Sequence, residues 1–145
     1  ALFGEQARSK GIRLHCADTR QRRHASVLTD RQLLDSILQN LVSNALKHTT
    51  SGAVYVGARW RLDYPAGHQL CIEVRDSGTG IASHLQPRLF EAYRSFDDRQ
   101  ASESHGLGLA IAKAQASYLG CDIRLRSVEG RGSTFTLCGL ALAPL

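Results

Sequence analysis

The sequence predicts a single domain of the α/β class, in which helices pack against a β-sheet. The chain has 145 residues, 43% of them hydrophobic, which suits one domain with a buried core. Residues 31–48 repeat apolar side chains at helical spacing, and the runs 12–16, 54–62, 69–75, 123–128 and 133–142 alternate as strands do. These two observations indicate helices and strands in one chain, and we expect no second domain.

The net charge of +5 and the pI near 9.3 suit an anionic partner, either a nucleic acid or a nucleotide with its metal. Charge alone does not choose between them. The densest basic cluster, formed by Arg20, Arg22 and Arg23, has no aromatic residues among it on which bases could stack. We therefore expect a solvated loop there and no nucleic-acid site.

Cysteine and histidine spacing argues against a metal site made only of protein ligands. The four cysteines, Cys16, Cys71, Cys121 and Cys138, are far apart, and the histidines lack ligand spacing. We expect buried free thiols in a reducing compartment. No apolar run reaches about 18 residues, and no signal-like segment is present, so we expect a cytoplasmic domain whose longer parent can still be membrane-anchored.

The N-terminal third is predicted to hold a short helix, a strand and a helix start. Leu2, Phe3 and Ala7 form one helical stripe within residues 1–10, and Gly11 ends it before the strand at 12–16. Residues 26–28 suggest a second brief strand. Either Thr29 or Asp30 can cap the helix that follows.

The helix predicted over residues 31–48 has an apolar and a polar face. The apolar stripe consists of Leu34, Leu38, Leu41 and Ala45. Asn40, Asn44 and Lys47 recur at spacings of four and three on a neighbouring face. Amide oxygens suit a hard cation such as Mg²⁺, and an ammonium suits phosphate. The alternative is a plain water-facing edge of the helix.

The hairpin predicted from strands 54–62 and 69–75 ends in the stretch DSGTGI, residues 76–81. Asp76 can accept a hydrogen bond from a neutral N–H donor, and Gly78 and Gly80 allow a ligand to approach bare backbone. A carboxylate would repel phosphate, so the stretch suits a nucleotide base. An ordinary strand-to-turn junction is the alternative.

The segment after this junction is predicted to be a helical turn within residues 83–90, limited by Pro87, and then a polar stretch without periodicity over residues 91–104. Such a stretch is typical of a functional lid, with a plain surface loop as the alternative. Three aromatic residues, Phe90, Tyr93 and Phe96, are spaced to anchor it.

Two glycines open the helix predicted over residues 106–120, and Gly120 stands at its C-terminal end. Free N–H groups and the positive end of the helix dipole make such a start an anion site, for which phosphate is the natural ligand. The strands 123–128 and 133–142 then form a hairpin through EGRG.

These motifs occur in a fixed order, and together they resemble the catalytic, ATP-binding domain of bacterial sensor histidine kinases in the GHKL superfamily. NLVSNALKHT resembles the N box, DSGTGI the first glycine box, LFEAYRSF the F box, GLGLAI the second glycine box, and GRGSTF the terminal glycine motif. The resemblance spans residues 11–137.

The resemblance implies a two-layer α/β sandwich of the Bergerat type. Its sheet would be mixed and mostly antiparallel, with about five strands, and three main helices would cover one face. ATP would bind between the helices and a lid at about 87–105. The domain would occupy residues 1–145, without the dimerisation domain that carries the phosphoacceptor histidine.

The resemblance also implies site residues. Asn44 would bind Mg²⁺ beside Asn40, and Lys47 and His48 would lie at the nucleotide. Catalytic roles would fall to Asn40, Lys47 and one of two lid arginines, Arg94 or Arg99. The remaining nucleotide contacts would come from Asp76, Gly78, Gly80, Ile81, Gly106, Leu107, Gly108 and Thr134.

One sequence position distinguishes the relatives that hydrolyse ATP from those that transfer its phosphoryl group. Hydrolysing relatives carry a Glu four residues before the metal-binding Asn, whereas this chain has Asn40, an amide that cannot take a proton. Transfer to an external nucleophile is therefore favoured over hydrolysis. An ATPase, or a nucleotide-sensing interaction module without kinase activity, stays open as an alternative. Ser104, in place of a usual glycine, is the feature that favours the module.

No sequence resembling an H box occurs in the chain, so it looks like an excised catalytic domain. The implied partners are ATP, a histidine-containing dimerisation domain of the same parent, and a downstream response regulator. We expect the isolated domain to be monomeric and to lack the full autokinase reaction. Its parent can be anchored in the inner membrane.

Overall fold

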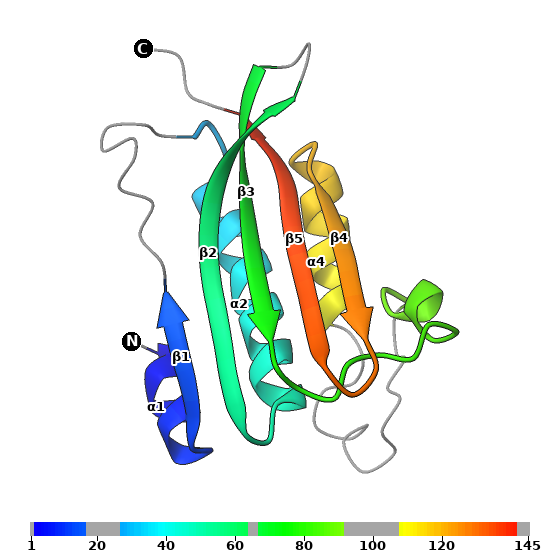
Figure 1. Ribbon diagram of the computed structural model, residues 1–145. Helices are drawn as coiled ribbons and strands as arrows, with labels where there is room; N and C mark the ends of the chain where they lie inside the picture. Colours follow the sequence, from blue (N-terminus) through cyan, green and yellow to red (C-terminus); the bar gives the residue numbers. More distant parts are fainter. Residues whose placement is uncertain (1, 17–26, 64–66, 92–107, 142–145) are drawn as a thin grey trace.

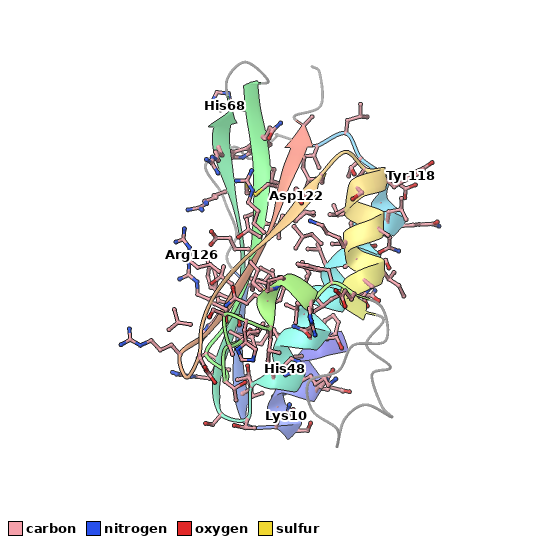
Figure 2. The ribbon with its side chains drawn as sticks, turned by 90° about the vertical axis from the view of Figure 1, so that its right-hand side faces the viewer. Lys10, His48, His68, Tyr118, Asp122 and Arg126 are labelled. Carbon is pink, nitrogen blue, oxygen red and sulfur yellow. The ribbon has the colours of Figure 1, made fainter. Side chains whose placement is uncertain are left out.

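The computed structural model describes residues 2–16, 27–63, 67–91 and 108–141. In this part of the chain, helices cover one face of a five-stranded sheet and leave the other face open (Figures 1 and 2). The elements in chain order are α1 (Leu2–Ser9), β1 (Ile12–Cys16), α2 (Arg31–His48), β2 (Gly52–Asp63), β3 (Gly67–Asp76), the 3₁₀ turn η2 (Gln86–Arg88), α4 (Gly108–Tyr118), β4 (Asp122–Val128) and β5 (Gly132–Ala141).

The strand order is β1-β2-β3-β5-β4. β1 pairs parallel with β2, and the other three pairs are antiparallel. The parallel pair is joined through α2, because a parallel connection must cross over the sheet, whereas β2–β3 and β4–β5 are hairpins. The expected α/β sandwich with a mixed, mostly antiparallel sheet is confirmed.

The helix α2 has the predicted bounds, and Asp30 is its N-cap. The carboxylate of Asp30 accepts a hydrogen bond from the Leu33 backbone N–H at 3.1 Å, whereas the Thr29 hydroxyl has no partner among the described residues. The buried side of α2 is wider than the predicted stripe. Leu34 and Leu38 are only partly buried, and the fully buried face consists of Ile37, Leu41, Val42, Ala45 and Leu46.

The core lies between the helices and the inner face of the sheet. Phe135, Leu137, Val54 and Val74 supply its sheet side and are inaccessible to solvent. Their neighbours along each strand point to the opposite face, because side chains alternate across a strand. The sheet therefore has an apolar face under the helices and a polar face in solvent.

Three expectations need correction or lie outside the described residues. Of the brief strand expected over residues 26–28, the structure describes two residues: Val27 makes a single bridge, and the Leu28 N–H donates to the Ala141 carbonyl at 3.1 Å, without a regular strand. Cys16 is exposed because it ends an edge strand, although Cys71 is buried and Cys121 and Cys138 are half-buried. The arginine cluster at 20–23 and most of the proposed lid lie outside the described residues.

Among the described residues, no helix is both long enough and apolar enough to cross a membrane.

Candidate functional site

Asp76 ends β3 at the lower end of the sheet in Figure 1 and is 5% exposed. Its Oδ1 accepts a hydrogen bond from the Gly78 backbone N–H at 2.9 Å. Burial raises the pKa of the Asp76 carboxyl above its usual 3.8, and backbone hydrogen bonds from Gly78 and Ser133 act in the opposite direction. A buried carboxylate with acceptor capacity left over is suited to a neutral N–H donor on a ligand.

Two glycines let the chain after Asp76 pass close to other backbone. A Cβ added at Gly78 would overlap the carbonyl oxygen of His48, the last residue of α2. Gly80 has a φ of 68°, and a Cβ there would overlap the Val128 carbonyl oxygen. The stretch is therefore held between the end of α2 and the β4–β5 hairpin, which requires glycine at both positions.

A network around Ser127 fixes the end of the same stretch. The Ile81 backbone N–H donates to the Ser127 Oγ at 2.8 Å, and the hydroxyls of Ser127 and Ser133 lie 2.8 Å apart. Gln86, in η2, donates from Nε2 to the Ile81 carbonyl at 2.9 Å. Sequence reasoning missed Ser127, Ser133 and Gln86, because none of them stands at a motif position that resembles a ligand contact.

On β5, the side chain of Ser133, and not that of Thr134, points to the same face of the sheet as the Asp76 side chain. Ser133 is 6% exposed and pairs directly with Asp76 across β3 and β5. Thr134 follows it, so its side chain points to the open face, where its cross-strand neighbours are Arg75 and Arg126. The structure thus brings Ser133 to the position that the sequence motif suggested for Thr134.

The polar face of α2 meets the start of α4. Asn40, Asn44 and Lys47 are partly buried, and a Cβ built on Gly108, the first residue of α4, would lie 3.5 Å from the Asn40 Oδ1. This contact places the N-terminal backbone of α4 beside an amide oxygen of α2. The arrangement can accommodate phosphate at the helix start.

The region around Asn40 and Asn44 fits a hard cation only if a bound nucleotide supplies further oxygen ligands. Among the described residues, no group of three His, Cys, Asp or Glu side chains is arranged to hold a metal ion. Asn40 and Asn44 present amide oxygens one turn apart on α2. Mg²⁺ keeps waters and binds protein through few ligands plus substrate phosphates, so the donor set fits Mg²⁺ carried by a nucleotide.

The first residues of the predicted lid pack against the core of the domain. The Phe90 ring packs edge-on against Phe135, with 6.2 Å between ring centres, and Leu89 is buried. The Lys113 Nζ, from α4, lies 5.3 Å from the centre of the Phe90 ring. The anchoring role expected for Phe90 is thus confirmed. The other lid and second-box residues, Tyr93, Arg94, Phe96, Arg99, Ser104, Gly106 and Leu107, lie outside the described residues.

Comparisons with known proteins agree with this geometry. Residues 29–143 match the model of the family described as histidine kinase-, DNA gyrase B- and HSP90-like ATPases. The aerobic respiration control sensor protein ArcB of Escherichia coli (strain K12) is 39% identical over 139 residues, which are 94% of this chain and 17% of that protein. The sensor protein EvgS of the same organism is 36% identical over 141 residues, which are 93% of this chain and 11% of that protein. The chain therefore spans less than a fifth of these relatives.

Solved structures show the same fold. Full-length ShkA, crystallised in complex with AMPPNP, superposes with a TM-score of 0.79 at 29% identity, over 99% of this chain and 29% of that chain. The catalytic domain of the histidine kinase ThkA superposes with a TM-score of 0.76 at 23% identity, over 96% of this chain and 85% of that chain. The chain belongs to the family of histidine kinase-, DNA gyrase B- and HSP90-like ATPases, and within it to the ATP-binding catalytic domains of sensor histidine kinases.

Proposed function

We propose that the domain binds ATP with Mg²⁺ and, within a longer parent protein, transfers the γ-phosphoryl group to a histidine on a separate dimerisation domain. A response regulator would receive the group next. The observation that carries the proposal is the placement of two polar sites along α2: Asp76 and Gly78 at the His48 end, and Gly108 beside Asn40. Eight residues of helix separate His48 from Asn40, or about 12 Å, a length that suits an extended nucleoside triphosphate.

The base would bind at the His48 end. Asp76 would accept a hydrogen bond from the exocyclic amine of adenine, and Ser133 would support that carboxylate in place of Thr134. Gly78, Gly80 and Ile81 would shape the pocket wall, since their backbone is already held by α2 and by the β4–β5 hairpin. Asp76 would thus select adenine and take no part in the chemistry.

The phosphates would bind at the Asn40 end. Lys47, which lies in the last turn of α2 next to His48, would contact the phosphate oxygens nearer the base, and the N–H groups at Gly108 would bind the farther phosphates at the start of α4. Asn44 would hold Mg²⁺, which neutralises charge on the phosphates when bound. Gly106, Leu107 and one lid arginine, Arg94 or Arg99, would complete this end of the site.

Transfer is favoured over hydrolysis because Asn40 stands beside the start of α4, and its amide cannot act as a general base. The ATPase alternative predicts steady phosphate release by the isolated domain without any acceptor. The alternative of a sensing module without kinase activity predicts nucleotide binding and no transfer. One assay distinguishes both alternatives from the kinase: a purified histidine-containing dimerisation domain is added together with labelled ATP. The kinase should then give labelled histidine in the acceptor.

The binding proposal is tested by calorimetric titration of ATP with and without Mg²⁺, using Asn44→Ala and Gln39→Ala. Gln39 is exposed on α2 and outside the proposed site, so it is the matched control. The wild-type domain and Gln39→Ala should bind ATP more tightly with Mg²⁺, whereas Asn44→Ala should lose this difference. An Asn44→Ala variant that kept the full Mg²⁺ effect would remove Asn44 from the metal site.

A further inference from the structure

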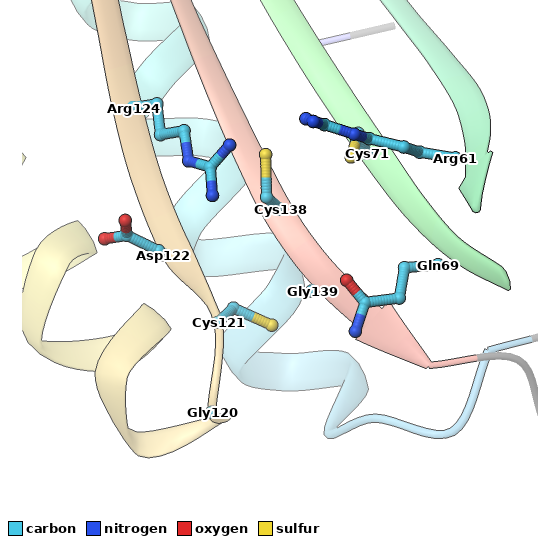
Figure 3. Close-up of a pocket in the computed structure, with 9 residues that line it drawn as sticks. All are labelled: Arg61, Gln69, Cys71, Gly120, Cys121, Asp122, Arg124, Cys138 and Gly139. Atoms are coloured by element: carbon cyan, nitrogen blue, oxygen red, sulfur yellow. The ribbon is translucent and has the colours of Figure 1, made fainter. Parts of the chain in front are cut away.

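A pocket of about 280 Å³ opens on the polar face of the sheet, away from α2 (Figure 3). It lies beside the link between α4 and β4 and faces solvent. Three of the four cysteines of the chain meet in it, although they are far apart in the sequence. The pocket is lined by Arg61, Gln69, Cys71, Gly120, Cys121, Asp122, Arg124, Cys138 and Gly139.

Two arginines approach the pocket from opposite sides. Arg61 comes from β2 and Arg124 from β4, and both guanidinium groups are directed toward Cys138 (Figure 3). In the part of the chain that the structure describes, neither has a carboxylate partner within ion-pair distance. Arg59 differs, since its guanidinium lies 2.9 Å from the Glu73 carboxylate on the same face. Two cationic groups in the pocket are therefore available to a ligand.

The acidic residue in the lining is already neutralised. The Asp122 Oδ1 lies 2.6 Å from the Lys113 Nζ and accepts the Ile123 backbone N–H at 2.9 Å. Figure 3 shows this carboxylate directed toward α4 and not toward Arg61. Its charge is therefore matched by a lysine that lies outside the pocket lining.

The thiols of Cys121 and Cys138 add no negative charge to the pocket. Burial raises the pKa of Cys138 to about 11, with the neighbouring Cys71 acting in the same direction and Arg124 and Arg61 opposing. Burial also raises the pKa of Cys121. At neutral pH the thiols of Cys121 and Cys138 are protonated, and no group of three ligating side chains in the described residues is arranged for a metal. A cation is therefore a poor occupant.

The C-terminal end of α4 also opposes an anion. A helix end carries about half a negative charge. Here its carbonyls are partly used, because the Cys121 N–H donates to the Ala116 carbonyl at 2.8 Å and the Gly120 N–H to the Ser117 carbonyl at 3.1 Å. Two full guanidinium charges outweigh this partial charge.

We propose that the pocket binds a small oxyanion ligand, carrying a phosphate or carboxylate groups, between Arg61 and Arg124. Guanidinium groups bind both kinds of oxyanion through paired N–H donors. The volume of about 280 Å³ is at the lower end of small-molecule sites, which excludes a large ligand. A Cβ added at Gly120 would meet no atom within 4 Å, so the space beside Gly120 is open to a ligand.

The test is a titration of the chain followed by backbone amide shifts in two-dimensional NMR spectra, at constant ionic strength. The probes are inorganic phosphate and succinate, with chloride as the reference salt. We expect saturable shifts at Gly120, Cys121 and Gly139, which are distinct from any shifts at the ATP site. Saturation by phosphate assigns a phosphate ligand, and saturation by succinate a dicarboxylate.

Charge-removing variants locate the binding groups. Arg61→Gln and Arg124→Gln should each weaken binding about tenfold, since charge-assisted hydrogen bonds are lost. Arg126→Gln is the matched control, because Arg126 is exposed on the same face and outside the pocket lining (Figure 2). The proposal is overturned if neither probe saturates these amides, or if Arg126→Gln weakens binding as much as Arg61→Gln.

Discussion

The Gly78 backbone N–H donates to the Asp76 carboxylate at 2.9 Å, while the Cα of Gly78 faces the His48 carbonyl so closely that no side chain fits there. This relationship orients a buried carboxylate and joins the end of β3 to the end of α2. Because the carboxylate is buried, it destabilises the apo domain when ionised and still offers lone pairs to a donor. In the proposed site, burial of Asp76 would therefore cost stability while it leaves an acceptor for the ligand.

Asp76→Asn separates these two effects. In the proposed site, the variant should bind ATP at least about tenfold more weakly, because it replaces a carboxylate acceptor by an amide. Without nucleotide, it should be more stable than the wild type at pH 7. Calorimetry measures the affinity and urea unfolding the stability. Unchanged ATP affinity would remove Asp76 from adenine recognition.

The stability difference should depend on pH in a defined direction. The pKa of Asp76 is raised in the folded protein, so the folded state holds its proton more tightly than the unfolded chain does. The wild type therefore loses stability as pH rises from about 3.8 through the raised pKa. The advantage of Asp76→Asn should vanish at the acidic end of this window, and an advantage independent of pH would contradict the explanation.

Gly78→Ala should destabilise the domain by roughly 1–3 kcal/mol, because the added methyl group overlaps backbone that cannot rotate away. Gly4→Ala is its control. Gly4 lies in α1 with open space around its Cα, so alanine there should be neutral or stabilising by up to about 1 kcal/mol. Thermal unfolding of both variants checks the comparison, and equal stability of Gly78→Ala and the wild type would contradict it.

Ser133→Ala and Thr134→Val distinguish the two faces of β5. Ser133 is buried beside Asp76 and Ser127, so its loss should weaken ATP binding severalfold and destabilise the domain by about 1 kcal/mol. Thr134→Val changes the open face and should leave ATP affinity unchanged. A larger loss of affinity in Thr134→Val would restore the role first inferred from the sequence.

Lys113→Gln should destabilise the link between α4 and β4 by about 0.5 kcal/mol, a small amount because the ion pair is partly exposed. The hydrogen bond from Lys113, the largest cause, lowers the pKa of Asp122 below 3.8. The contribution is therefore present above that value and is lost as pH falls through the lowered pKa. Urea unfolding at pH 7 and pH 3 checks this; an effect larger at pH 3 would contradict it.

Much of the fold could be predicted from the sequence because the signals are local. The bounds of α2 follow from Asp30 and from apolar spacing, and both hairpins follow from their turns. Gly78 and Gly108 were identified from motif order. The structure explains Gly78, where a Cβ would overlap the His48 carbonyl oxygen, whereas a Cβ at Gly108 would make only an ordinary contact with Asn40.

The sequence could not separate Ser133 from Thr134. Both are small hydroxyl residues in one motif, and only the register of β5 against β3 decides which of them faces Asp76. A shift of one residue along a strand reverses the face of every side chain, so motif reading alone has no means to choose.

The sequence by itself determined the elements, their order and the family, because capping, periodicity and turn chemistry act over a few residues. Only the tertiary structure decided which distant residues meet. It inserted β5 between β3 and β4, and it gathered Cys71, Cys121 and Cys138 with two arginines around one pocket on the open face. The physical reason is that strand pairing joins residues by hydrogen bonds across the sheet, whatever their separation along the chain.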